Sequence, residues 1–141
     1  MKYRGIIVKE KPRFWKFIPW LSSYIALTFF SRIYVSEKIF DNLSLDNHSP
    51  KLIATLEHER KHIERQQEIG LFKFGFKYFF SPKFRFQEEL VAIRESMKHL
   101  KRNKLNFDID RGAKFLSSWL YLWMISYDEA KEKLEKAWKE T

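Results

Sequence analysis

The sequence contains no cysteine, and this absence restricts the chemistry open to the chain. Disulfide bonds and thiolate metal sites are excluded, so a metal ion would have to be bound by imidazole and carboxylate groups. A chain without cysteine also fits a reducing compartment, and we expect a cytoplasmic location.

Long apolar runs are also lacking. The longest segment without a charged residue, Phe17 to Ser31, is shorter than the roughly 20 residues that a membrane-spanning helix requires. It contains a proline and three serines. Arg32 follows it, where a signal peptide would have the small residues of a cleavage site. We therefore expect no membrane span, and we predict a buried strand in this segment.

The residues that are present indicate a folded protein of basic character. Hydrophobic residues make up 45% of the 141 positions, which predicts one domain over residues 1–141 with a real core. The formal net charge of +9 favours contact with nucleic acid, anionic lipid or acidic protein surfaces. Nucleic acid is the less favoured partner, because no run of five basic residues occurs.

The first third of the chain has the composition of β-structure. The segment Arg4–Val8 contains the apolar run GIIV, and Ile25–Val35 is dense in aromatic and β-branched residues. The Asn, Asp, Ser and Pro content of Asp41–Pro50 predicts a loop. A helix is then predicted to begin with Ser49 as its cap and Pro50 in its first position, and to end at Gly70.

The rest of the chain is predicted to be mainly helical. We interpret the phenylalanine-rich segment Leu71–Phe80 as a helix whose aromatic residues pack in the core, with base stacking as the alternative. Amphipathic or apolar patterns predict helices over Phe84–Lys101 and Ala113–Met124, and Ser126 with Glu129 forms a capping box for a last helix. These elements predict an α+β fold, mainly helical, with a small N-terminal sheet packed on the central helix.

The central helix carries the motif His-Glu-x-x-His in the stretch LEHERKHIERQQ. His58 and His62 are four residues apart, so both imidazoles can reach one ion from the same side of a helix. Glu59 can reach a water on that ion without being a ligand, which is the position of a general base. The alternative is a solvated basic helix, because charged residues surround the motif: Glu57, Arg60, Lys61, Glu64 and Arg65.

A zinc site of this type needs a third protein ligand. The stretch FRFQEELVAI offers Glu88 and Glu89 on the next amphipathic helix. Glu89 borders the apolar stripe through Phe86 and Ile93, so its side chain can point inward. The alternative is that both glutamates are surface charges.

The sequence resembles the zincin metallopeptidases of the glutamate-ligand kind. Two motifs carry the resemblance: His58-Glu59-x-x-His62 and Glu89-x-x-Ala92. More narrowly, it looks like small stand-alone zincin-like proteins encoded by bacteria and tailed phages. The resemblance runs from about Trp20 to Leu134, and the segments outside the two motifs match only as patterns. The larger group of glutamate-ligand zincins often has an acidic residue after its Glu-x-x-Ala motif, which orients a ligand histidine. This chain has Ile93 at that position.

The resemblance implies a zincin-like fold and a role for each matching residue. His58, His62 and Glu89 would bind one zinc ion per chain, with Glu59 as the general base. The strand Ala26–Val35 would be the edge along which an extended peptide pairs. Tyr121 would donate to the developing oxyanion, although a core tyrosine with a satisfied hydroxyl is the favoured interpretation of that residue.

These expectations lead to a zinc-dependent metallopeptidase acting on a peptide or protein substrate in a bacterial or phage-infected cell. The alternative is a non-enzymatic structural or assembly protein of the same fold, such as a virion component that contacts other phage or bacterial proteins. In that case the metal would be structural or absent. A third hypothesis is a basic nucleic-acid or membrane-surface binder that uses the Phe/Lys-rich stretch after Gly70.

Overall fold

The computed structural model describes residues 1–17, 26–44 and 48–141. The described part of the chain is mainly helical and has a small sheet near the N-terminus. This confirms the predicted α+β class and the position of the sheet.

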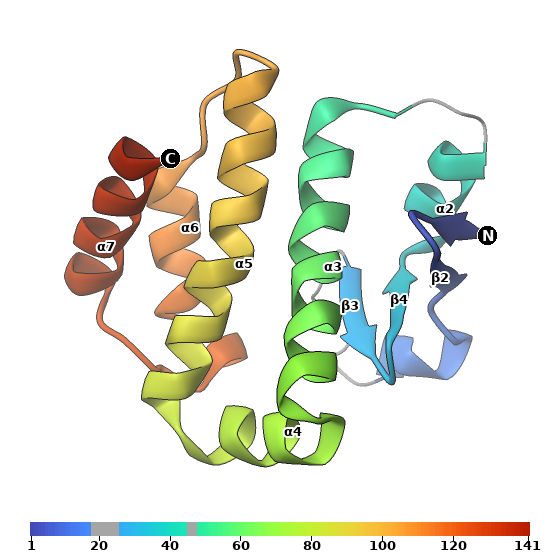
Figure 1. Cartoon of the computed structure of the whole chain (residues 1–141), viewed down its shortest axis with the longest axis horizontal. Coiled ribbons are helices and arrows are strands. Elements are labelled where there is room, and N and C mark those ends of the chain that lie inside the picture. The colour runs from blue at the N-terminus through green and yellow to red at the C-terminus, as the bar shows by residue number, and fades with distance from the viewer. Residues whose placement is uncertain (18–25, 45–47) are drawn as a thin grey trace.

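Two long helices, α3 (Pro50–Ile69) and α5 (Pro82–Arg102), lie side by side in the middle of the molecule (Figure 1). The sheet packs on α3, as predicted, and the C-terminal helices α6 (Ile109–Leu116) and α7 (Tyr127–Glu140) lie beyond α5. The short helix α4 (Leu71–Phe80) connects the ends of α3 and α5.

The sheet is built from short strands, and β2 and β4 pair in parallel while the outer pairs are antiparallel. Their order across the sheet is β1-β2-β4-β3. Among the described residues the strands are β1 (Lys2–Tyr3), β2 (Ile6–Glu10), β3 (Ala26–Phe29) and β4 (Arg32–Val35), and a 3₁₀ helix, η1 (Arg13–Phe17), follows β2.

The segment predicted to be one edge strand, Ala26–Val35, is a hairpin, so this part of the prediction is wrong. Phe30 and Ser31 join β3 to β4 with φ angles of 48° and 57°. A two-residue turn with positive φ at both positions matches the right-handed twist of antiparallel strands, which reverses the chain here. The strand expected in Phe17–Ser31 is confirmed as β3, and positions 18–25 of that segment lie outside the described residues.

The predicted loop over Asp41–Pro50 is also partly wrong, because α2 (Glu37–Ser44) extends into it. Leu43 is buried, and Ile39 and Phe40 pack against the same core as the sheet. This packing stabilises a helix in a segment whose composition alone favours a turn.

The bounds of α3 agree with the prediction. The Ser49 hydroxyl accepts a hydrogen bond from the Leu52 amide (3.2 Å), and Pro50 occupies the first turn. Gly70 ends the helix with φ 94° and ψ 132°, a conformation that residues with a Cβ rarely adopt. The chain then turns directly into α4.

Helix α4 confirms the helical interpretation of Leu71–Phe80, but its aromatic residues do not pack as predicted. Phe74 is buried, whereas the other phenylalanines of the helix are exposed. The expectation that this aromatic stripe is mainly core is therefore wrong. The exposed residues recur at helical spacing: Phe72, Phe76, Phe79 and Phe80.

Beyond α5 the apolar segment Ala113–Met124 is not one helix as predicted. α6 begins at Ile109, with Asp108 as its cap, and ends at Leu116. A single 3₁₀ turn, η2 (Trp119–Tyr121), follows, and then Leu122 and Trp123 adopt positive φ. The predicted cap Ser126 accepts a hydrogen bond from the Glu129 amide and starts α7.

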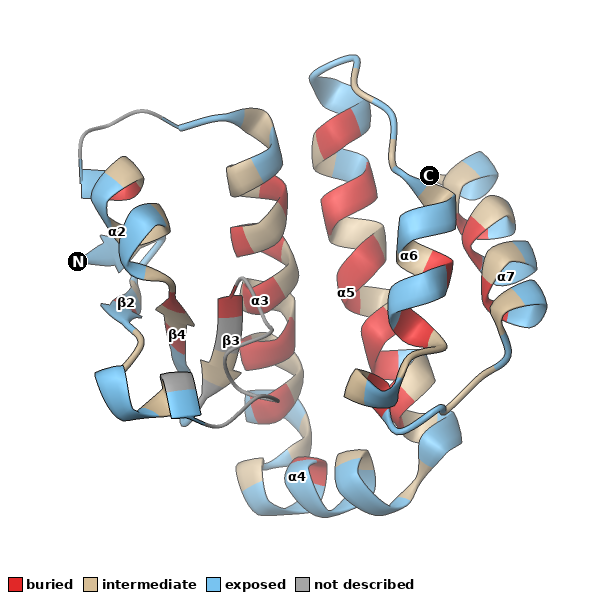
Figure 2. Cartoon of the chain, turned by 180° about the vertical axis from the view of Figure 1, so that it is seen from behind, coloured by how far each residue is buried: buried red, intermediate tan, exposed pale blue. Residues whose placement is uncertain are grey.

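Two hydrophobic clusters flank the central helices, and Figure 2 shows buried residues concentrated along α3 and α5. The first cluster joins the sheet to α3 through residues such as Ile33, Leu56 and Ile63. The second joins α5 to α6 and α7 through residues such as Met97 and Leu134. The faces of α3 and α5 that meet between the clusters are free to carry polar groups.

We expect Gly70→Ala to lower the free energy of unfolding by about 1–3 kcal/mol, because alanine is strained at this φ and ψ. Gly75→Ala is the matched control, since Gly75 lies inside α4 with ordinary backbone angles and an added Cβ would meet no atom within 4 Å. Gly75→Ala should stabilise by about 0.5–1 kcal/mol. Urea denaturation measures both changes, and opposite signs are required.

Candidate functional site

The central helices bring together three side chains that were predicted to share a metal ion. His58 and His62 project from α3 and Glu89 from α5, and their nearest ligand atoms all lie within 4.8 Å of one another. Nε2 of His58 is 3.1 Å from Nε2 of His62. The Glu89 carboxylate oxygens lie 3.4 Å from His58 Nε2 and 3.3 Å from His62 Nε2.

These separations fit a small cation with a tetrahedral shell. Ligands bonded at about 2.0–2.1 Å in a tetrahedron lie about 3.3–3.4 Å from one another. Two imidazoles and one carboxylate also form a donor set that zinc accepts, with a fourth position left for water. Within the part of the chain that the structure describes, this is the one group of three such residues close enough to hold a metal ion.

The close approach of the two helices depends on small residues. Ala54 on α3 is buried, as are Ala92 and Ser96 on α5. The Ser96 hydroxyl donates a hydrogen bond to the Ala54 carbonyl (2.7 Å), which joins the helices directly. Because these side chains are short, the longer histidine and glutamate side chains can meet between the helices.

Two tyrosines bind the Glu89 carboxylate, one oxygen each. The Tyr121 hydroxyl donates to Oε2 (3.1 Å), and the Tyr78 hydroxyl donates to Oε1. Tyr121 therefore contacts the candidate ligand in this structure, and its role as an oxyanion donor remains a prediction. Tyr78 was not predicted as a site residue, although it is the one tyrosine in the phenylalanine-rich segment of α4.

A buried guanidinium binds the backbone carbonyls of both tyrosines. Arg85 is buried, and its Nε and Nη2 donate to the carbonyls of Tyr78 (2.8 Å) and Phe79 (2.6 Å) at the end of α4. Its Nη1 donates to the carbonyl of Tyr121 (3.1 Å). One cation on α5 thus holds the two segments that carry the tyrosines, and no sequence pattern pointed to it.

The charges of the cluster favour an ionised carboxylate. Burial alone raises the pKa of Glu89, but the neighbouring His62 and His58 imidazoles hold it well below its usual range. Burial likewise lowers the pKa of His62, and the Glu89 carboxylate opposes this effect and raises it to about 8. The site is therefore an anion between two imidazoles, which suits a divalent cation.

The predicted general base, Glu59, points to the sheet side of the cluster. The Thr28 hydroxyl of β3 donates to its Oε2 (2.7 Å), so the carboxylate is held against the edge of the sheet. Glu59 is buried and lines the same cavities as His58 and Glu89. Thr28 was not singled out in the sequence, because its contact depends on the packing of β3 against α3.

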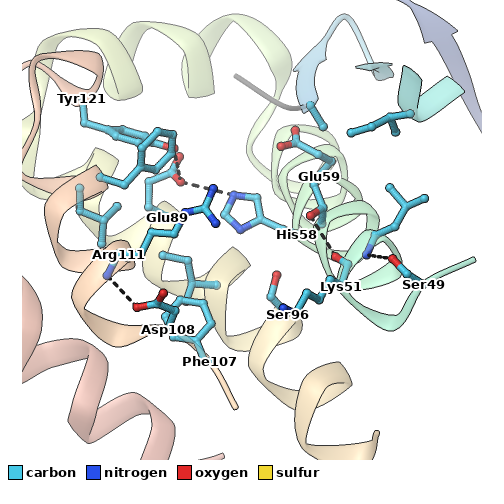
Figure 3. A pocket seen from close by; sticks show the side chains of 18 of the residues that line it. Ser49, Lys51, His58, Glu59, Glu89, Ser96, Phe107, Asp108, Arg111 and Tyr121 are labelled. Carbon is cyan, nitrogen blue, oxygen red and sulfur yellow. Dashed lines mark hydrogen bonds and ion pairs between the residues drawn. The ribbon is translucent and has the colours of Figure 1, made fainter. Parts of the chain in front are cut away.

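Two cavities meet at this cluster. The first, of about 700 Å³, is called the mixed cavity because polar and charged side chains such as Lys51, Ser96, Asp108 and Arg111 line it together with apolar ones (Figure 3). The second, of about 570 Å³, is called the apolar cavity and lies on the α4 side. Each is lined by His58, Glu59, Glu89 and Tyr121.

The remaining predicted positions have structural surroundings. Glu88, the other candidate third ligand, points to Arg65 of α3 and accepts two hydrogen bonds from it, from Nε to Oε2 (2.9 Å) and from Nη2 to Oε1 (2.8 Å). Ile93, at the place where an acid orients a ligand in the larger group, is buried in the second cluster. Within the predicted pairing edge Ala26–Val35, only β3 is an edge strand among the described strands, because β4 lies between β2 and β3.

Comparison with known proteins found no match among family models, curated proteins or solved structures. None of the helices in residues 1–17, 26–44 and 48–141 has both the length and the apolar content needed to cross a membrane.

The ion pair beside the site yields a test of what holds α3 against α5. Glu88 and Glu68 bind the same guanidinium, but their side chains are 4% and 55% exposed. We expect Glu88→Gln to lower the free energy of unfolding by about 1.5–3 kcal/mol. Glu68→Gln should change it by less than about 0.5 kcal/mol. Equal losses in urea denaturation would contradict the importance of the buried pair.

Proposed function

We propose that this protein is a zinc-dependent metallopeptidase. The observation that carries the proposal is the convergence of His58, His62 and Glu89 from two helices, at separations that suit one tetrahedral cation. The resemblance of the two motifs to glutamate-ligand zincins supports the same assignment, and we extend it to a zincin-like fold. Peptides or proteins would be the substrates.

The residues around the cluster suit each part of the reaction. A bound zinc ion supplies a Lewis acid that makes water nucleophilic near neutral pH. Glu59 would accept the proton of that water, and the Thr28 hydroxyl, which donates to Oε2, would hold the carboxylate in place. The water oxygen would then bond to the carbonyl carbon, the peptide C–N bond would break, and Glu59 would return the proton to the leaving amine nitrogen.

The hydroxyls of Tyr78 and Tyr121 have a positioning role in this proposal. They occupy both oxygens of Glu89 and so fix the orientation of the carboxylate toward the histidines. Groups that form hydrogen bonds with a metal ligand restrict the orientation of that ligand and tune its basicity. Arg85 contributes indirectly through the carbonyls of the same two tyrosines.

A non-enzymatic structural or assembly protein is the second candidate. One observation favours it: the same three side chains join the half that contains the sheet and α3 to the half that contains α5, α6 and α7. A metal at this place would stabilise the fold even without chemistry. The two candidates differ in what they require of Glu59, which is not a ligand.

Zinc binding is the first test of the proposed function. Chelator-treated protein titrated with Zn²⁺ should bind one ion per chain and melt at a higher temperature when loaded. His58→Ala, His62→Ala and Glu89→Ala should each lose stoichiometric binding in isothermal calorimetry. The matched control, His48→Ala, should retain it, because His48 is exposed and lies outside the cluster. Unchanged binding in the first three variants would refute the assignment.

The role of Glu59 as the general base is the second test of the proposed function. Glu59→Gln keeps the size of the side chain but cannot accept the proton, so peptide hydrolysis should fall about 10²–10⁴-fold while one zinc ion per chain is retained. The assay pairs hydrolysis of a mixed peptide pool, followed by mass spectrometry, with elemental analysis. Unchanged hydrolysis by Glu59→Gln would refute Glu59 as the base, whereas zinc binding without hydrolysis by the wild type would support the structural protein.

A further inference from the structure

The apolar cavity joins the candidate metal cluster to a surface that carries many exposed aromatic residues. Its floor is formed by His58, Glu59 and Glu89, and its walls by residues of α4 and the β3–β4 turn. Most of the wall residues are nonpolar and aromatic, and the polar residues Thr28, Gln66 and Tyr78 also line the cavity. The nonpolar wall residues are Phe30, Leu71, Phe72, Phe74, Phe76 and Phe79.

Helix α4 faces this cavity with a continuous stripe. Phe72, Phe76 and Phe79 recur at spacings of four and three residues, so they lie along one side of the helix. Phe72 is 88% exposed, and Phe76 and Phe79 are 67% and 60% exposed. Large aromatic side chains exposed together beside a cavity lower their free energy when an apolar ligand covers them.

The charge distribution restricts what the cavity can accept. Among the described residues no lysine or arginine lines it, and its charged and titratable groups are the candidate metal cluster, Glu59, and the hydroxyls of Tyr78 and Tyr121. A carboxylate or ammonium group among the phenylalanines would lose its hydration without a partner of opposite charge. The mixed cavity differs, because Lys51, Asp108 and Arg111 line it. The preference for an apolar side chain is therefore confined to one side of the cluster.

The sheet offers a way to align a substrate along this wall. Ala26 and Thr28 of β3 line the apolar cavity, and β3 is one of the two edge strands among the described strands, the other being β1. A peptide paired with an edge strand directs alternate side chains to the same face. One such side chain can enter the apolar cavity while the neighbouring carbonyl lies at the cluster.

We propose that the apolar cavity binds a large aliphatic or aromatic side chain of the substrate, next to the peptide bond that is cleaved. This inference rests on the proposed peptidase function and adds the substrate class to it. Phe72, Phe76 and Phe79 of α4 are the specificity-determining residues, together with Phe30 of the β3–β4 turn.

The test uses zinc-loaded full-length protein and a set of fluorogenic peptides. In each peptide one position carries Phe, Leu, Gly, Asp or Lys, and the set repeats this substitution at successive positions of the peptide. At one position relative to the cleaved bond, kcat/KM for Phe and Leu should exceed that for Asp and Lys at least about tenfold. Phe72→Asp and Phe76→Asp should reduce this ratio to below about three, since each adds an anion to the cavity wall.

Phe17→Asp is the matched control, because Phe17 is also 88% exposed but does not line the cavity. It should leave the ratio unchanged. Melting temperatures of the three variants should stay close to that of the wild type, since the replaced side chains are exposed. Equal cleavage of all peptides, or a preference that survives both Phe72→Asp and Phe76→Asp, overturns the inference and leaves the peptidase proposal intact.

A binding experiment tests the apolar cavity independently of peptide hydrolysis. Anisotropy of the labelled Phe and Asp peptides with Glu59→Gln should show tighter binding of the Phe peptide, and Phe76→Asp should abolish the difference. This result without hydrolysis by the wild type would refute the peptidase and retain an apolar-peptide site. Binding of neither peptide overturns the inference.

Lipid is the competing occupant, because Lys73 and Lys77 flank the exposed phenylalanines. Cosedimentation with vesicles of equal parts phosphatidylcholine and phosphatidylglycerol should show no binding that depends on Phe72 and Phe76. Vesicle binding lost in both aspartate variants would identify an anionic membrane surface as the occupant and would overturn the inference.

Discussion

The buried carboxylate of Glu89 is the constraint on which the rest of the structure depends. Only 2% of the Glu89 residue is exposed, and an isolated ionised carboxylate is costly to remove from water. Two imidazoles of α3 and two phenolic hydroxyls offset that cost. All four partners come from outside α5, so the carboxylate is satisfied only when α3, α4 and the η2 turn are packed around it.

A second buried charge makes this arrangement rigid. The Arg85 guanidinium lies one turn before Glu89 on α5 and binds backbone carbonyls, which carry no net charge. Its position at the C-terminal end of α4 is electrostatically favourable, because a helix C-terminus has partial negative charge. Arg85 and Glu89 thus act on the same tyrosines, Arg85 through their carbonyls and Glu89 through their hydroxyls.

Features set by local sequence were predictable, and features set by packing were not. Ser49, Pro50 and Gly70 defined α3, because caps and helix stops depend on neighbouring residues. His58 and His62 were placed together by the helical repeat alone. Tyr78 could not be assigned to Glu89 in advance, since that contact requires the fold of α4 against α5.

The exposed phenylalanines of α4 show a second limit of composition. A phenylalanine has the same hydropathy in a core and beside a cavity, so the sequence favoured burial for a stripe that is mostly exposed. The hairpin at Phe30 and Ser31 was missed for a related reason, because neither residue is typical of a turn with positive φ. Both departures from the local rules lie beside the candidate site.

The basic character of the chain offsets the exposed apolar surface that this arrangement creates. Lys73 and Lys77 lie on α4, yet neither lines the apolar cavity. Like charges on the outer surface keep molecules apart, whereas charges within the cavity would oppose an apolar ligand. The division of α4 into a cavity-facing phenylalanine stripe and flanking lysines therefore reconciles two requirements: an apolar surface at the site and repulsion between copies of the chain.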